Sequence, residues 1–241
     1  MLTSDTMKME ERFKFRKVEL HEKELMQKIY RLRFEIYCYE CGFIKEEDHP
    51  NKLDIDEYDQ QSVHFAAIDN TDGEVTGTLR MIQPGKLPLP IQKYCPDITI
   101  EKTGIELSRF VISKRIRRRR DDDLYYGPQI DTGTSEQSRA DREEAERRSK
   151  PMAFGLYRAM YLESKALQLT HWYTLMEKGL CLLLWVHGFE FDCIGPEVDL
   201  MGKVKPYAGN IAHIEKKVAQ KFPKFFQYFT KENDEVSLNG N

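Results

Sequence analysis

The chain has 241 residues, of which 32% are charged and 40% hydrophobic, and its formal net charge is −3. We expect one α/β domain over 1–241 without the basic surface of a nucleic-acid-binding protein. The longest apolar run, residues 180–186, is far shorter than the roughly 18 to 20 residues of a membrane-spanning helix. The N-terminus lacks the apolar segment of a secretory signal. These features predict a cytoplasmic protein with no stable membrane insertion and no nucleic-acid partner.

The N-terminal half of the sequence has the patterns of a helix and a sheet. Leu25, Ile29, Leu32 and Ile36 follow one another at helical spacing, which predicts a helix over residues 21–41 after a short strand. An acidic segment with a proline predicts a loop over 43–61. Two strands, 62–69 and 74–82, are then expected around a turn at Asn70–Gly73.

The second half continues with alternating strands and helices. We expect strands over 104–113, 170–176 and 203–209, and helices over 151–167, 178–187 and about 211–230. The order of the elements predicts a mixed central sheet flanked by helices.

A charged insert separates the two halves. Of the 37 residues from Lys114 to Lys150, 20 are charged, and so we expect an insert at about 115–150 that is disordered through 127–148. Its basic run is either a solvated face or a docking surface for phosphates or an acidic carrier protein. Asp121–Asp123 cancel half of that charge, which disfavours nucleic acid. The candidate carrier-docking residues are Arg115, Arg117, Arg118, Arg119 and Arg120.

The five cysteines predict neither disulfides nor a metal site. Their number is odd, and the CxxC motif of Cys38 and Cys41 has no second motif to complete a zinc site. We interpret these two thiols as half-buried side chains on a helix. No metal and no cofactor are expected.

Three segments in the same order resemble the acyl-homoserine-lactone (autoinducer) synthases. They are Arg33–Tyr37 with Gly42–Phe43, Asp54–Asp59, and Arg80 followed by Glu106–Phe110. A longer set of segments resembles the N-acyl amino acid synthases and the acyltransferases associated with exosortase/PEP-CTERM systems, over roughly residues 20–210. This set includes YRLRFEIYCYECGF, GTLRMI, LPLPIQKYC, ELSRFVISKRIRRR and GFEFDCIGPEVDLMGKVKPY.

The resemblance implies the Gcn5-related N-acetyltransferase (GNAT) fold, with an acyl thioester between the fourth and fifth strands. Two positions depart from the autoinducer synthases, because Phe43 stands where they usually carry tryptophan and Asp54 where they tend to carry glutamate. These departures disfavour S-adenosylmethionine as a substrate. The glycine-rich pyrophosphate loop of acetyl-CoA-dependent members is also missing, which favours a long acyl chain on a carrier protein.

Glu106 is the candidate catalytic residue, a general base for the attacking amine. A carboxylate in a partly apolar cleft can have its pKa raised toward neutral pH. The alternative role is an ion pair with Arg109 or Arg33. A regular strand sends Glu106 and Arg109 to opposite faces, whereas a β-bulge between them puts both on one face. Because this fold characteristically has such a bulge, we predict one at about 107–109.

The remaining candidate substrate-binding residues are charged. Three aspartates either hold the ammonium group of an acceptor or pair with three arginines in a buried network, which we favour for Asp56 and Asp59. Metal binding by the aspartates is a minor alternative. The arginines can instead bind a carboxylate of the acceptor. These residues are Arg33, Asp54, Asp56, Asp59, Arg80 and Arg109.

An acyl chain needs an apolar pocket. Four apolar residues of the predicted strands are candidates for this pocket, and plain core packing is their alternative role. They are Phe110, Ile112, Trp172 and Met176.

These observations predict an N-acyltransferase. It would move a long-chain acyl group from acyl-carrier protein or acyl-CoA, used as co-substrate, to a small-molecule amine acceptor such as an amino acid. One alternative is an autoinducer synthase that uses S-adenosylmethionine. Another is a non-catalytic module that binds acyl thioesters, which an inactive Glu106→Gln variant would argue against.

Overall fold

The computed structural model describes residues 11–114 and 152–231. The predicted insert at 115–150, with the five candidate docking arginines, lies outside the described residues. No helix in the described ranges is long and apolar enough to cross a membrane.

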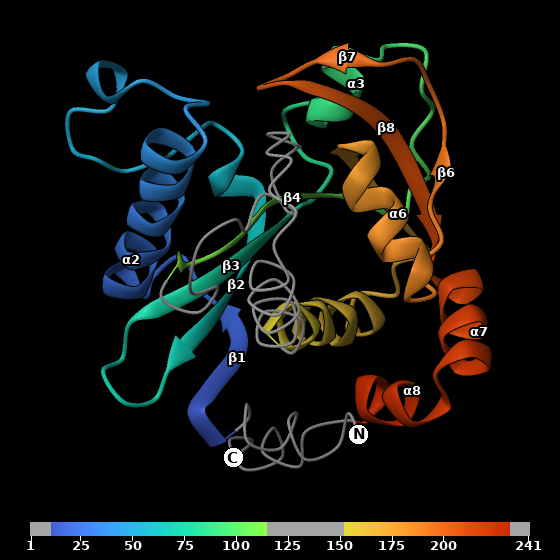
Figure 1. Cartoon of the computed structure of the whole chain (residues 1–241). Helices are drawn as coiled ribbons and strands as arrows, with labels where there is room; N and C mark the ends of the chain where they lie inside the picture. The colour runs from blue at the N-terminus through green and yellow to red at the C-terminus, as the bar shows by residue number, and fades with distance from the viewer. Residues whose placement is uncertain (1–10, 115–151, 232–241) are drawn as a thin grey trace, which may run out of the picture.

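The strands form one mixed sheet in the order β1-β2-β3-β4-β5-β8-β6, and β7 pairs with β8 (Figure 1). All neighbouring pairs are antiparallel except β4 and β5, which are parallel. The strands are β1 (Phe13–Val18), β2 (Ser62–Asp69), β3 (Val75–Ile82), β4 (Gly104–Ile112), β5 (His171–Met176), β6 (Asp192–Cys193), β7 (Val198–Asp199) and β8 (Lys203–Asn210).

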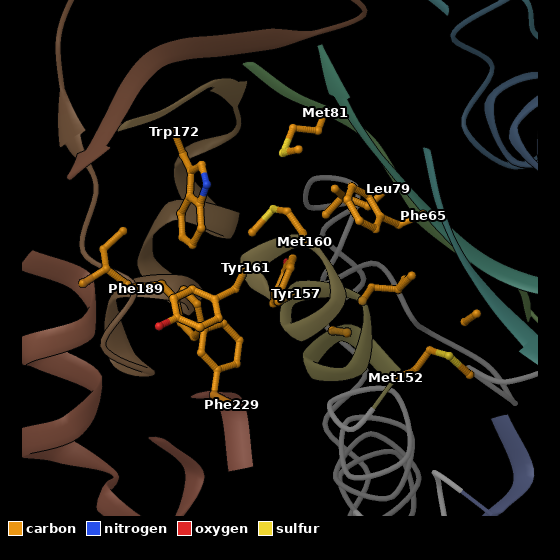
Figure 2. Packing of buried hydrophobic residues seen from close by; sticks show 14 of the residues in the cluster. Phe65, Leu79, Met81, Met152, Tyr157, Met160, Tyr161, Trp172, Phe189 and Phe229 are labelled. Atoms are coloured by element: carbon orange, nitrogen blue, oxygen red, sulfur yellow. The ribbon is translucent and has the colours of Figure 1, made fainter. Parts of the chain in front are cut away.

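Helices cover both faces of this sheet (Figure 1). On one face, α2 (Lys23–Phe34) packs through Met26, Ile29 and Leu32 against a small apolar cluster that includes Ala66 and Val111. On the other face, the helix over 152–166 forms the centre of the larger core with α7 (Ile211–Lys221) and α8 (Pro223–Thr230). Figure 2 shows Tyr157 and Met160 of the central helix between the sheet residues Leu79 and Met81 and the aromatic rings of Phe189 and Phe229.

The sheet divides between β4 and β5. These strands pair only through Gly104–Glu106 and His171–Tyr173, although both continue beyond this contact. At its start Gly104 packs so closely against the Tyr173 side chain that a Cβ atom on Gly104 would lie 2.5 Å from the Tyr173 ring. Beyond these paired residues β4 and β5 are not paired with each other. The opening between them leaves room for a cavity.

The predicted strands are all present, but two predicted helices differ from the structure. The helix expected over 21–41 ends as an α-helix at Phe34 and continues as a π-helical turn, Glu35–Glu40, in which the Cys41 N–H donates to the Ile36 carbonyl. The C-terminal helix expected over 211–230 is two helices, α7 and α8. Pro223 cannot donate a backbone hydrogen bond and disfavours the helical conformation of Phe222, so the chain turns there.

Two short α-helices and two 3₁₀ helices, Glu46–Asp48 and Asp59–Gln61, complete the described chain. The segment between β3 and β4 contains α3 (Pro90–Tyr94), which our sequence analysis did not predict. Its start carries a proline, the residue favoured at the first helical position. The helix α6 (Lys178–Val186) follows β5 and was predicted over 178–187.

Candidate active site

A bulge in β4 determines which side chains face the site. Thr78 pairs with Val111 and Arg80 with Ser108, so that Leu79 alone faces two residues, Arg109 and Phe110. This confirms the predicted bulge, although it lies at residues 109–110 and so extends one residue beyond the predicted range of about 107–109. Arg109 has a φ of 52°, in the left-handed region that costs a residue with a side chain of order 1 kcal/mol or more.

The bulge changes the alternation of side chains along β4. Ile105, Leu107, Phe110 and Ile112 all pack in the larger core. Glu106, Ser108, Arg109 and Val111 lie toward α2, where Ser108 accepts a hydrogen bond from Arg80 and Arg109 contacts two aspartates. Glu106 and Arg109 therefore share one face, which a regular strand would not allow.

The three arginines and three aspartates form a closed ring of ion pairs. Asp54 joins Arg33 and Arg109, Asp56 joins Arg109 and Arg80, and Asp59 joins Arg80 and Arg33. The six nitrogen–oxygen distances run from 2.5 to 3.0 Å. Each charge thus has two opposite neighbours, which offsets much of the cost of removing these groups from water. The ring fits the pairing role that our sequence analysis considered for these residues.

Burial and charge act against each other on two aspartates of the ring, Asp54 and Asp59. Burial alone would raise their pKa values, but the arginines outweigh it, so the pKa of Asp54 is lowered and that of Asp59 falls to about 2. His64, fully buried beside the ring, donates from Nε2 to the Asp59 carbonyl oxygen at 3.1 Å. Burial lowers the pKa of His64, so it stays neutral there.

Glu106 lies next to the ring but outside it. Its side chain is 2% exposed, and its Oε2 accepts a hydrogen bond of 2.8 Å from the backbone N–H of Ile91 in α3. Burial raises the pKa of Glu106 to about 8, against the lowering effects of that hydrogen bond and of Arg80. A buried carboxyl group that changes protonation near neutral pH is suited to accept a proton.

A cavity of about 400 Å³ lies where β4 and β5 separate. Its lining includes Glu106, Arg80 and Arg109 from the α2 side of the sheet. The cavity is also lined by residues of the larger core on the opposite side, so it reaches both faces of the sheet through the opening between the strands. The lining residues of the larger core include Leu79, Phe110, Ile112, Tyr157, Met160 and Trp172. Leu175 and Met176 of β5 line the cavity as well.

The structure brings most of the predicted site residues to this cavity. All four candidates for the acyl pocket, Phe110, Ile112, Trp172 and Met176, line it. Among the candidate substrate-binding residues, Asp56, Arg80 and Arg109 also line it. The other three are not among the lining residues. Arg33, Asp54 and Asp59 are fully or almost fully buried behind the wall, where each is held by two ion pairs.

Other residues of the site lie in segments that carry the family resemblance but were not among the candidate site residues. Tyr37 and Phe43 come from the π-helical turn and the loop after it, and both line the cavity. The Arg109 guanidinium lies over the Tyr37 ring at 5.3 Å. Tyr58 and Lys93 reach the cavity from the acidic loop and from α3. Within the described parts of the chain, no three His, Cys, Asp or Glu residues are grouped to hold a metal ion.

Comparison with known proteins identifies the fold. A family model described as an acetyltransferase (GNAT) domain matches residues 32–126. The structure of BjaI, a CoA-dependent acyl-homoserine lactone synthase with SAM and isopentyl-CoA, has a TM-score of 0.61 and 15% identity over 86% of this chain and 88% of that chain. The acyl-homoserine-lactone synthase LasI has a TM-score of 0.55 and 15% identity over 83% of this chain and 89% of its own.

A third similar structure is FeeM, an N-acyl amino acid synthase from uncultured soil microbes. Its TM-score is 0.51 and its identity 12%, over 87% of this chain and 96% of that chain. These matches show that the protein has the GNAT fold, a mixed central sheet with flanking helices, as the sequence predicted. The divided sheet, the β4 bulge and the cavity are features of that fold in this chain.

The ion-pair ring predicts a large effect of removing one charge. Arg33→Met leaves Asp54 and Asp59 buried with one partner fewer each, and we expect a loss of about 3–5 kcal/mol in the free energy of unfolding. Urea denaturation at neutral pH measures it. Lys52→Met, which removes an exposed pair with Glu46, should cost less than about 1 kcal/mol. Equal effects of the two substitutions would contradict a stabilising ring.

Proposed function

We propose that the protein is an N-acyltransferase that moves a long acyl chain from acyl-carrier protein or acyl-CoA to the amine of an amino acid or similar metabolite. The observation that carries this proposal is the position of Glu106. Its carboxyl group, with a pKa raised to about 8, lies in the wall of a cavity that continues between apolar side chains of the larger core. A proton acceptor and an acyl-sized apolar space thus meet at the opening between β4 and β5.

The reaction places each group in a defined role. The acceptor nitrogen attacks the thioester carbonyl carbon, the new C–N bond forms and the C–S bond breaks. Glu106 accepts the proton of the amine, directly or through a water molecule, and the leaving thiolate takes up a proton. Backbone N–H groups at the β4 bulge are the candidate donors to the oxyanion, because a bulge interrupts the regular pairing of the strand.

The acyl chain would occupy the apolar part of the cavity. Pockets of this size accommodate ligands as large as a drug molecule, and the walls here are mostly aliphatic and aromatic. The similarity of the fold to FeeM, an N-acyl amino acid synthase, agrees with this class of product. A carrier protein as donor remains part of the proposal.

To test this function, the purified protein is incubated with a pool of amino acids and with acyl-carrier proteins or acyl-CoAs of several chain lengths. Thiol release and the masses of the products are measured. We expect an N-acyl amino acid as product. Glu106→Gln, which keeps the size of the side chain and removes the base, should lower kcat/KM by about 10²- to 10⁴-fold. Thioester binding without turnover by the wild-type protein would instead support the non-catalytic binding module.

Protonation of Glu106 also links activity and stability to pH in opposite directions. Activity should rise with pH up to about 8, as the carboxyl group becomes a base. Stability should fall over the same rise, because the folded state holds the proton between the usual pKa of 4.5 and about 8 while the unfolded state releases it. Glu106→Gln should lose this part of the pH dependence of unfolding. A variant with unchanged pH profiles would contradict the assignment.

The acceptor's carboxylate needs a cation that is free to pair. Arg80 and Arg109 line the cavity, but each already has two aspartate partners. Lys93 also lines the cavity, is exposed, and makes no ion pair with the described residues. It lies two residues after Ile91, whose N–H binds Glu106. Lys93 is therefore our candidate for carboxylate recognition close to the base.

Replacing Lys93 should change acceptor selectivity. For Lys93→Ala we expect KM for an amino acid to rise about 10- to 100-fold, because a charge-assisted hydrogen bond is lost. KM for the acyl thioester and for the amino acid methyl ester should stay the same. Lys102→Ala, at an exposed lysine that is not among the lining residues, is the matched control. An equal rise of KM for the ester would count against carboxylate binding.

The cavity wall predicts control of chain length. Leu180 of α6 lines the cavity, and Leu180→Phe should shorten the space for the acyl chain. We expect kcat/KM for a palmitoyl thioester to fall about tenfold or more while that for an octanoyl thioester changes little. Leu167→Phe, at an exposed position at the end of the helix over 152–166, is the control. Parallel losses for both chain lengths would place the chain elsewhere.

A specific observation supports a second function. Acyl-homoserine-lactone synthases, one solved with SAM, share this fold at the TM-scores given above. Two positions argue against this second function, because the chain has Phe43 and Asp54 where the autoinducer synthases usually carry tryptophan and glutamate. The same assay supplied with S-adenosylmethionine separates the two functions: a lactone product would favour the synthase, whereas an N-acyl amino acid formed without it would favour our proposal.

A further inference from the structure

The helix α6 is apolar on two opposite faces. None of its nine residues, KGLCLLLWV, is fully buried. Leu180 and Leu184 line the cavity, as expected for residues one turn apart. On the outside, Leu182, Trp185 and Val186 are 55%, 51% and 57% exposed, and their spacing places them on one face. One helix thus separates the acyl-sized cavity from the surroundings of the protein.

An exposed surface of this kind is unusual in a protein that stays in water. A single exposed leucine needs no explanation, but three large apolar side chains together on one short helix form a patch typical of an interaction site. The outward residues do not contribute to the core, since the large core includes Leu184 of this helix but not them. Their exposure is therefore better explained by binding to another surface than by folding.

Lysines border this apolar face. Lys178 begins α6, and the Lys221 ammonium of α7 lies 4.4 Å from the centre of the Trp185 ring and 3.3 Å from the Trp185 carbonyl oxygen. Together α6, α7 and α8 carry five lysines and one glutamate. Glu190, which binds Lys217 and Lys221, offsets part of this charge. Lys178, which makes no ion pair with the described residues, keeps a positive charge at the start of the apolar face.

We propose that the outer face of α6 docks on an anionic lipid bilayer. Leu182, Trp185 and Val186 enter the boundary between headgroups and acyl chains, and Lys178 and Lys221 contact lipid phosphates. A helix of nine residues is far too short to span the bilayer, but helices that lie in its surface combine these features: tryptophan and leucine on one side, lysines around them. An acidic carrier protein is a poorer candidate for this face, because the three side chains at its centre, Leu182, Trp185 and Val186, are apolar and cannot pair with acidic groups.

The proposal requires no turnover, so its test is independent of the proposed function. The full chain is mixed with phosphatidylcholine vesicles with and without phosphatidylglycerol, and binding is followed by sedimentation and by tryptophan fluorescence. Because Trp172 is 1% exposed, a blue shift on binding reports on Trp185. We expect binding that needs the anionic lipid and weakens with salt.

Two variants test the surface itself. Leu182→Ser/Val186→Ser keeps Trp185 as the fluorophore and should weaken vesicle binding about tenfold or more, because two apolar side chains no longer enter the bilayer. Lys178→Glu should weaken it about tenfold through the reversed charge. Leu20→Ser and Lys102→Glu, at exposed positions elsewhere in the chain, are the matched controls and should bind as the wild type.

Several results would overturn the proposal. One is the absence of any blue shift or sedimentation with anionic vesicles. Another is an equal loss of binding in the Leu20→Ser control. A third is self-association, seen by light scattering, that Leu182→Ser/Val186→Ser abolishes, since the face would then join two copies of the chain. Saturable binding of an acyl-carrier protein that requires the same two side chains would likewise assign the face to a protein partner.

Discussion

The closed ring of three arginines and three aspartates is the interaction on which the site depends. It joins elements far apart in the sequence, because Arg33 comes from α2, the aspartates from the loop before β2, and Arg80 and Arg109 from β3 and β4. Alternating charges make each member depend on two others, so the ring holds a long irregular loop against a regular sheet. The cost of burying six charges is offset only while every partner is present.

The ring and the bulge support one another. Arg109 has a backbone conformation that is unfavourable for a residue with a side chain, and it is held there by two carboxylates and the Tyr37 ring. The same conformation lets Glu106 and Arg109 face one way while Phe110 turns into the apolar core. Charge pairing on one face of the sheet thus shapes an acyl-sized space on the other.

The sequence predicted the strands because hydrophobic alternation is a local signal. It predicted the neighbourhood of the bulge because the family resemblance implied a bulge in that strand. It also grouped Glu106, Arg80 and the four candidate pocket residues, and the structure brings all six to one cavity. It favoured pairing in a buried network for Asp56 and Asp59, but it did not predict that Arg33 and Asp54 lie behind the cavity wall, since residue type cannot distinguish a paired charge from a free one. The break before α8 could have been predicted from Pro223, whereas α3 and the contribution of Lys93 depend on tertiary packing.

The π-helical turn after α2 has a consequence for how this chain can change in length. Its hydrogen bond from Cys41 to Ile36 encloses one more residue than an α-helical turn does. Deleting one residue within 35–40 would restore ordinary helical geometry, a locally more favourable conformation. It would also rotate the following chain, moving Phe43 away from the cavity and disturbing the contact of Tyr37 with Arg109. A more regular helix in this segment would therefore disturb the cavity wall. The number of residues in the segment is constrained more tightly than their identity.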